Sequence, residues 1–150
     1  MTRWRQQYGF SVIEFMILVA LLCVAAAIGV PNFIEMQYRA QRAEVPTNIE
    51  GIRVAAVAYR AENGTINSES VTRPDANPGN RLRPWKGGPQ FDALGWRPDG
   101  EVRGSYTLAT TQQGTFSVKG FCDVDGNGRR ANFEVDSQGN VYQLTHSDVY

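Results

Sequence analysis

Apolar residues follow one another almost without interruption from residue 10 to residue 30, and the one acid among them is Glu14. A helix of this length, at ~1.5 Å per residue, spans roughly 30 Å, the thickness of the hydrocarbon layer of a membrane. Arg3 and Arg5 precede the run, which predicts that its N-terminal side faces the cytoplasm. The pattern therefore predicts a membrane-spanning helix, and the carboxylate near its start needs a partner because a lone charge in hydrocarbon is costly.

A second helical pattern continues beyond the apolar run, where apolar residues recur at spacings of three and four and form one stripe. We expect a single helix from residue 10 to about residue 62, ended by Asn63-Gly64. Pro31 and Pro46 should each bend or loosen it, because proline cannot donate the backbone hydrogen bond of a helix. The stripe consists of Val45, Ile49, Ile52, Ala56 and Tyr59.

Prolines and glycines replace this periodicity between residues 63 and 103, which predicts a long connecting loop. Over residues 104–150, apolar and polar positions alternate in short stretches separated by turns, the pattern of an antiparallel meander. The stretches are GSYTLATT, GTFSVKGF, ANFEVD and NVYQLTH. The expected fold class is therefore α+β, a long N-terminal α-helix packed against a C-terminal four-stranded antiparallel β-meander.

Two sets of apolar residues are expected to hold these parts together. The first set should pin the connecting loop to the helix or the strands, and it comprises Trp85, Phe91, Leu94 and Trp96. The second set is the apolar face of the meander, which should cover the stripe on the helix because both surfaces need burial. This face is expected to include Tyr106, Leu108, Phe116, Val118, Phe133, Val135, Val141 and Leu144.

The stretch G-F-S-V-I-E, the apolar run after it and the stretch G-V-P-N-F resemble the precursors of type IV pilins and pseudopilins. The resemblance implies that a prepilin peptidase cuts between Gly9 and Phe10 and methylates the new N-terminal Phe10. It implies an assembly role for Glu14, whose carboxylate would pair with the Phe10 amine of a neighbouring copy. It also implies a bend of the helix at Gly29 and Pro31.

The same resemblance divides the chain into three parts. Residues 1–9 would be the leader peptide, and residues 10–33 the hydrophobic transmembrane and assembly helix. Residues 34–150 would form the globular pilin domain. Within that domain the helix is expected at 34–62, the connecting loop at 63–103 and the meander at 104–150.

On this resemblance the chain is expected to be a structural subunit of a type IV pilus, a major or minor pilin that serves adhesion, twitching motility or DNA uptake. Its expected partners are other copies or other pilins in a homopolymer or mixed polymer, the prepilin peptidase and methyltransferase, the pilus assembly machinery and the inner membrane. The alternative is a pseudopilin of a type II secretion system. The stretch FDALGWRP resembles pilins of the myxobacterial kind and favours the pilus.

The expected location follows from the same reasoning. The precursor would lie in the inner membrane, with a cytoplasmic N-terminus and a periplasmic C-terminal domain. Once assembled, the subunit would belong to an extracellular pilus or a periplasmic pseudopilus.

Other interpretations of the N-terminal segment stay open. Ala25, Ala26 and Ala27 would suit cleavage of an ordinary secretion signal, and Cys23 would be lipid-modified in a lipoprotein, although the bulky Leu22 precedes it. The segment would otherwise be a plain anchor that tolerates its acid. An anchored periplasmic binding module that never polymerises would keep its first residue.

One turn in the meander satisfies the calcium-loop pattern D-x-[DN]-x-[DN]-G-x5-E. Some pseudopilins that resemble this chain bind calcium near the C-terminus, which makes calcium a candidate cofactor. The flanking stretches are strands rather than helices, and Arg129 and Arg130 add positive charge, so a plain hairpin turn competes with this interpretation. The candidate ligands are Asp123, Asp125, Asn127 and Glu134.

Charge and composition bring no signal for other classes of function. The chain has 15 basic and 15 acidic residues and no long basic block, so nothing in it indicates direct nucleic-acid binding. The single histidine, His146, lacks a nucleophile or metalloprotease motif around it and is expected at the surface or a strand edge. Cys122 is expected to be a free thiol, because Cys23 lies in the membrane segment. We expect no catalytic residues and no enzyme.

Overall fold

The computed structural model describes residues 9–66, 70–110 and 115–150. All but the last residue of the predicted leader, and the turn expected at 111–114, lie outside the described residues. The chain divides into two compact units, Met1–Gln37 and Tyr38–Tyr150.

Two consecutive helices form the N-terminal half of the chain, α1 (Val12–Arg42) and α2 (Glu44–Asn63). The break at Ala43 follows from Pro46, which has no N–H to donate to the carbonyl of Arg42 and whose ring crowds that carbonyl. The expected loosening at Pro46 is thus confirmed, whereas α1 continues through Pro31. The helix ends as predicted, because Gly64 adopts a φ of 77° and donates its N–H to the carbonyl of Arg60 at 2.8 Å.

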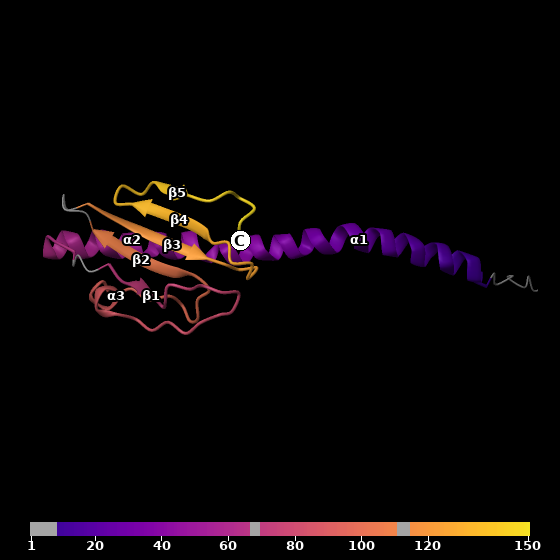
Figure 1. Ribbon diagram of the computed structural model, residues 1–150, viewed down its shortest axis with the longest axis horizontal. Helices are drawn as coiled ribbons and strands as arrows, with labels where there is room; N and C mark the ends of the chain where they lie inside the picture. The colour runs from indigo at the N-terminus through magenta and orange to yellow at the C-terminus, as the bar shows by residue number, and fades with distance from the viewer. Residues whose placement is uncertain (1–8, 67–69, 111–114) are drawn as a thin grey trace, which may run out of the picture. The chain divides into compact units, whose positions relative to one another are not determined.

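The second unit contains a single antiparallel sheet with the strand order β1-β2-β3-β4-β5, drawn in this order from one side of the sheet to the other in Figure 1. The four predicted strands are confirmed, and a two-residue strand precedes them in the predicted connecting loop. The loop also contains a short helix, α3 (Pro89–Ala93). The strands are β1 (Thr72–Arg73), β2 (Ser105–Thr110), β3 (Phe116–Cys122), β4 (Ala131–Asp136) and β5 (Val141–Gln143).

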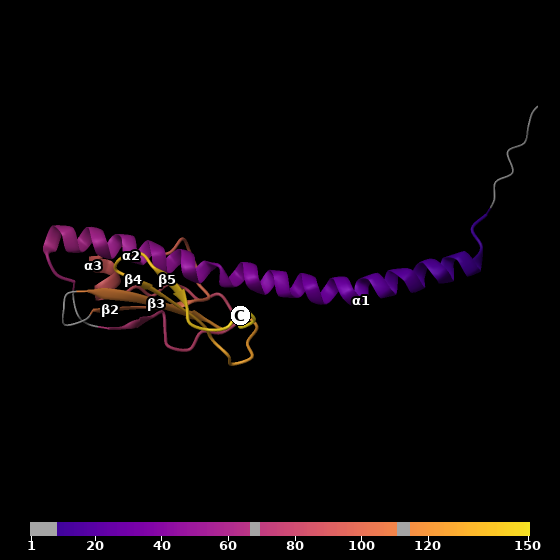
Figure 2. The same cartoon turned by 90° about the horizontal axis from the view of Figure 1, so that it is seen from above.

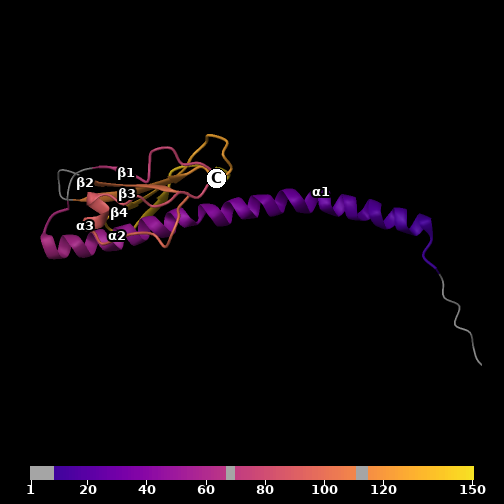
Figure 3. The same cartoon turned by 90° about the horizontal axis from the view of Figure 1, so that it is seen from below.

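Helix α2 lies along one face of this sheet (Figures 2 and 3) and supplies one apolar stripe to the core. Four of the five predicted stripe residues are fully buried, and Tyr59 at its end is half-buried. The strands contribute the residues that alternate toward the helix, as predicted for β2, β3 and β4. The buried residues of the two surfaces are Val45, Ile49, Ile52, Ala56, Tyr106, Leu108, Phe116, Val118, Cys122, Ala131, Phe133 and Val135.

Helix and sheet approach so closely that the chain needs glycine at one strand position. A Cβ atom added to Gly120 of β3 would lie 2.6 Å from the Cγ2 of Ile49 and 2.6 Å from the Cγ1 of Val45. This separation is well inside van der Waals contact, so a side chain at residue 120 would push α2 away from the sheet.

The prediction that Val141 and Leu144 belong to the buried face is wrong. Their exposed fractions are 50% and 57%. Leu144 lies opposite Asn132, on the face away from α2, because side chains alternate along a strand. Val141 lies opposite the buried Val135 on the apolar face, but β5 is the edge strand of the sheet. At the edge of a sheet, a side chain on the apolar face is buried only if a neighbouring element extends over it.

The connecting loop is pinned to the core as expected. Phe91 of α3 is 1% exposed, and Trp85, Leu94 and Trp96 pack against the buried cluster. The ring of Trp85 meets the rings of Phe91 and Trp96 edge-on, at centroid distances of 5.2 and 5.4 Å. Aromatic pairs of this geometry add to the burial of the rings, so the loop has its own stabilising contacts.

Candidate functional site

The predicted cleavage position lies just before the first helix. Gly9 and Phe10 are exposed and precede α1, and the Phe10 side chain is 68% exposed. The helix begins at Val12, two residues later than the sequence predicted. The peptide bond between Gly9 and Phe10 is therefore outside the helical hydrogen-bond ladder, where a peptidase could reach it.

A capping box fixes the start of α1. The N–H of Ile13 donates to the Oγ of Ser11 at 3.3 Å, and the N–H of Ser11 donates to the Oε2 of Glu14 at 2.8 Å. These reciprocal bonds satisfy donors that the first turn of a helix leaves unpaired. The signal is present in the sequence as S-x-x-E, but the family resemblance points to a partner from another chain, the Phe10 amine, and not to this local one.

The capping box changes the interpretation of Glu14. In the single chain its carboxylate already accepts a hydrogen bond from the backbone of Ser11. A hydrogen bond to one N–H does not neutralise the charge, so an ammonium group would still be the stronger partner in a low-dielectric environment. Ser11, which the sequence-based expectations leave out, is thus the residue that holds the Glu14 carboxylate within the chain.

The remainder of the apolar segment exposes its side chains on every side of the helix. No residue of α1 is buried within the chain, and Cys23 is exposed on the same helix. By length and composition, the helical segment that contains α1 is the one segment of the described residues that could cross a membrane. A Cβ atom added to Gly29 would have no neighbouring atom within 4 Å, so packing within the chain does not require a glycine at this position.

The predicted functional residues of this segment therefore fall into two groups. The structure brings Gly9, Phe10 and Glu14 together around the first turn of α1. Gly29 and Pro31 lie further along the same helix, which continues through them.

A partly buried hydrogen-bond network fastens the start of α2 to the sheet. The Oε1 of Glu44 accepts the hydroxyl of Tyr106 at 2.9 Å and the backbone N–H of Arg103 at 3.0 Å. The Nδ2 of Asn48 donates to the same tyrosine hydroxyl at 2.8 Å. Burial, followed by the nearby Glu44 carboxylate, raises the pKa of Tyr106, so the hydroxyl keeps its proton and remains a donor.

The C-terminal residues are fastened to the end of α1. The guanidinium of Arg42 donates to the carbonyls of Val149 and Ser147 at 2.7 and 2.9 Å, and it lies over the ring of Tyr150 at 5.3 Å. Just before this segment, His146 contacts Asp148 at 2.6 Å, and this hydrogen bond lowers the pKa of the Asp148 carboxyl. The His146 side chain is 80% exposed, which confirms its predicted surface position.

The candidate calcium ligands lie in two different places. Asp123 and Asp125 belong to the turn between β3 and β4, where they accept the N–H groups of Gly128 and Asn127 at 3.0 and 3.2 Å. Glu134 lies within β4, where its carboxylate is 3.8 Å from the Nζ of Lys119 on the neighbouring strand.

Among the residues that the structure describes, no group of three acidic, cysteine or histidine side chains converges on a metal position. The Oδ1 of Asp123 is nevertheless buried without a protein partner. Asp125 also holds the side-chain amide of Asn127. Calcium binding stays a prediction.

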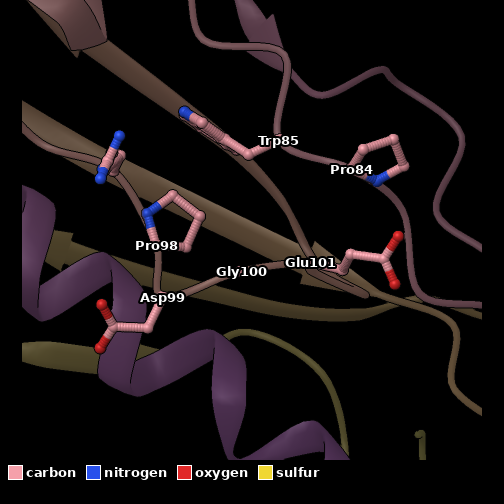
Figure 4. A pocket seen from close by; sticks show the side chains of 7 residues that line it. Pro84, Trp85, Pro98, Asp99, Gly100 and Glu101 are labelled. Atoms are coloured by element: carbon pink, nitrogen blue, oxygen red, sulfur yellow. The ribbon is translucent and has the colours of Figure 1, made fainter.

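A surface cavity of about 480 Å³ opens beside the connecting loop. Figure 4 shows that the carboxylates of Asp99 and Glu101 point away from each other at this cavity. Two carboxylates that point apart do not share a proton. The cavity is lined by Pro84, Trp85, Arg97, Pro98, Asp99, Gly100 and Glu101.

Comparison with known proteins gives one informative similarity, and no family model matches the chain. The chain is 41% identical over 54 residues to the type IV major pilin protein PilA of Myxococcus xanthus. The matched segment makes up 36% of this chain and 24% of the length of that relative.

Proposed function

We propose that this type IV pilin-like protein is a structural subunit, a major or minor pilin, of a type IV pilus. The similarity to PilA, the long N-terminal helix and the antiparallel sheet confirm the resemblance to the type IV pilin family. Pilins are structural rather than enzymatic proteins, which agrees with the expected absence of catalysis. The roles in adhesion, twitching motility or DNA uptake are part of the proposal.

The observation that carries the proposal is the exposed apolar surface of α1. Large apolar side chains such as Phe15, Leu22 and Ile28 are 57%, 60% and 66% exposed. A soluble monomer rarely exposes an apolar surface of this extent, so the helix needs a covering from outside its own chain. The inner membrane would provide that covering for the precursor, and the helices of sister subunits would provide it in the polymer.

Processing at the start of α1 would connect these two environments. A prepilin peptidase would cut between Gly9 and Phe10, in the exposed stretch before the capping box. Removal of the leader would leave the ammonium group of Phe10 close to the N–H of Ser11 that Glu14 holds. The same turn would then present one positive and one negative group to neighbouring copies.

Glu14 would exchange partners when the polymer forms. Within one chain its carboxylate accepts the backbone N–H of Ser11 at 2.8 Å. Among packed helices it would accept the Phe10 ammonium of a neighbour, because an opposite charge is the better partner away from water. This exchange would let the charged groups select the register of the packed helices.

A pseudopilin of a type II secretion system is the alternative function, and the N-terminal features suit it equally. The similarity to a protein described as a major pilin favours the pilus. In both cases the partners are other pilin-type subunits, the processing peptidase and an assembly machinery, and the precursor lies in the inner membrane with its C-terminal unit in the periplasm.

The proposal is tested by two substitutions of Glu14. Glu14→Gln retains a side-chain acceptor for the N–H of Ser11 but removes the charge, whereas Glu14→Leu removes both. Both variants should insert into the membrane, and both should lower the yield of fibres by about tenfold or more, corresponding to at least ~1.4 kcal/mol of assembly free energy.

The yield is measured by shearing fibres from cells and comparing them with the membrane-bound pool. Normal assembly of Glu14→Gln together with failure of Glu14→Leu would show that Glu14 acts through the capping box alone. Normal assembly of both variants would refute a role for Glu14 in the polymer.

A further inference from the structure

The two edges of the sheet are treated differently by the chain. At one edge, β1 has only two residues, Pro74 follows it directly, and the loop at Gly88 packs against it. An added Cβ on Gly88 would lie 2.6 Å from the Nε of Arg73. At the other edge, Val141 and Tyr142 of β5 are 50% and 49% exposed, and no other strand of the described residues pairs there.

The hydrogen-bond pattern shows which backbone groups face this open edge. The N–H of Asp136 donates to the carbonyl of Asn140 at 3.2 Å, and the N–H of Leu144 donates to the carbonyl of Asn132 at 2.9 Å. In an antiparallel pair, hydrogen-bonded and non-hydrogen-bonded positions alternate.

The register pairs Tyr142 with Glu134, midway between these two bonded positions, so Tyr142 directs its backbone groups toward β4. Val141 and Gln143 lie at the positions between, opposite Val135 and Phe133. Their N–H and C=O groups therefore point away from β4, along the open edge.

The open edge is also held in place before any partner arrives. The turn that leads into β5 is closed by the carboxylate of Asp136, which accepts the N–H of Asn140 at 2.9 Å, and the side chain of Arg53 lies against Gly139. After β5, the Oγ1 of Thr145 accepts the N–H of Asn132 at 3.0 Å. A strand fixed at both ends loses little conformational freedom when another strand joins it.

Apart from the three-residue length of β5, the open edge lacks the usual protection against pairing. Natural edge strands are commonly guarded by lysine, by proline or by inward-pointing charge. The stretch NVYQLT, residues 140–145, contains none of these. Two identical copies could therefore approach along this edge without placing like charges opposite each other.

We propose that β5 pairs with β5 of a second copy of this chain, antiparallel and centred on Tyr142. In this arrangement Val141 of each copy exchanges both backbone hydrogen bonds with Gln143 of the other, because these residues supply the outward-facing groups. The two Tyr142 side chains then face each other at a non-hydrogen-bonded position. They lie on the side of the sheet away from α2, since Tyr142 pairs with the outward-facing Glu134.

The symmetry of this β5 pair determines whether the two joined copies belong to the same fibre or to different fibres. The two-fold axis between two antiparallel edge strands is perpendicular to the sheet, and α2 lies along the sheet (Figures 2 and 3). The axis therefore reverses the direction of α2 from one copy to the other. Neighbours within one polymer point the same way, so β5 pairing joins subunits of different fibres and does not depend on the proposed helix-mediated polymerisation.

Disulfide trapping in the full chain gives the first test. In a Cys23→Ser background, Tyr142→Cys places two thiols opposite each other at a non-hydrogen-bonded position, where Cβ atoms approach within ~4.5–5.5 Å. The matched control is Leu82→Cys, because Leu82 is 45% exposed and lies outside β5. Any association through the apolar helix in detergent is the same for both variants.

Mild oxidation should give a disulfide-linked dimer fraction about fivefold higher for Tyr142→Cys than for Leu82→Cys, since only the first pair is held within bonding distance. Equal fractions for the two variants would overturn the proposal, because they would show that helix association or random encounter explains the trapping.

A charge exchange at the two-fold axis gives the second test and identifies the occupant. Tyr142→Lys and Tyr142→Glu should each weaken self-association by about tenfold, through loss of the aromatic pair and repulsion of like charges. Mixing the two variants should restore co-purification of a tagged copy with an untagged one. Restoration supports the proposal; failure of the mixture to recover, with both variants still able to capture an unrelated extended peptide, would assign the edge to another partner and overturn it.

Discussion

Helices α1 and α2 are separated by a single residue, yet they differ in how far the chain buries their apolar side chains. No residue of α1 is buried within the chain, whereas Val45, Ile49 and Ile52 of α2 are fully buried against the sheet. The apolar residues of α2 form one stripe, which a single sheet can cover. Those of α1 surround the helix, so only an environment that encloses it from all sides can cover them.

This difference in burial shows which contacts stabilise each helix. Helix α2 is stabilised by contacts that the chain makes with itself, through its stripe and the network of Glu44 with Tyr106. Helix α1 begins with its own capping box, but its apolar surface is exposed in the single chain, and in the proposed function the membrane or other subunits would cover it. Substitutions in the two helices should therefore affect different measurements.

The largest expected difference comes from removing one large apolar side chain from each helix. Ile52→Ala leaves a cavity in the core of the globular unit and should lower its free energy of unfolding by about 2–5 kcal/mol. Leu22→Ala, at a position 60% exposed within the chain, should leave that free energy unchanged. Urea unfolding of the full chain in detergent measures both, with tryptophan fluorescence as the probe because Trp85 and Trp96 pack against the core. Equal losses would remove the distinction between the two helices.

A smaller difference is expected from the glycines. Gly120→Ala should destabilise the globular unit by about 1–3 kcal/mol, because the new Cβ would lie 2.6 Å from side-chain atoms of α2. Gly29→Ala has open space around it and should favour helix formation by up to ~1 kcal/mol without changing the unfolding of the globular unit. The same urea titration measures the first effect, and circular dichroism in detergent measures the second. An undisturbed Gly120→Ala would contradict the close approach of helix and sheet.

The smallest effect concerns the thiol beneath α2. Burial, followed by the nearby Glu44 carboxylate, raises the pKa of Cys122 to about 12, so the folded chain keeps the thiol protonated. The stabilisation from a raised pKa is complete below the unfolded value near ~8.5 and is lost as the pH rises toward the folded value. In a Cys23→Ser chain at pH 8, iodoacetamide should label folded Cys122 at least about tenfold more slowly than urea-unfolded Cys122. Equal rates would mean that this side of the core is open to solvent.

The sequence predicted the parts of the fold that are encoded by local periodicity. The stripe at Val45, Ile49 and Ile52 has a helical spacing, and the strands β2 to β4 alternate cleanly, so both were recognised. Strand β1 is not predicted because its two residues are too few to show an alternation of apolar and polar positions. The position of the break at Ala43 is not predicted, because Pro46 indicates that the preceding helical turn is weakened but does not determine which residue leaves the helix.

The residues whose burial or partner differs from the prediction are placed by contacts between distant parts of the structure or with the backbone, which the periodicity of the sequence does not reveal. Val141 shares the face of the buried Val135, but burial at a sheet edge also depends on how far the neighbouring helix extends, and Leu144 lies on the opposite face. The expected partner of Glu14 is the Phe10 amine of a neighbouring copy, whereas within the chain its carboxylate accepts the backbone N–H of Ser11. The predicted cleavage and assembly roles of Gly9, Phe10 and Glu14 rest on family resemblance, and they need a chemical test.

Mass spectrometry of the protein from the membrane of cells that make it tests the central claim most directly. The account predicts an intact mass and an N-terminal peptide that begin at N-methylated Phe10, since the exposed bond after Gly9 would be cut and the apolar helix kept. A chain that begins at Met1 would leave Glu14 without a Phe10 ammonium partner, and a chain that begins at the residue after Ala27 would lack Glu14 altogether. Either result would contradict the proposed assembly of this chain through its N-terminal helix.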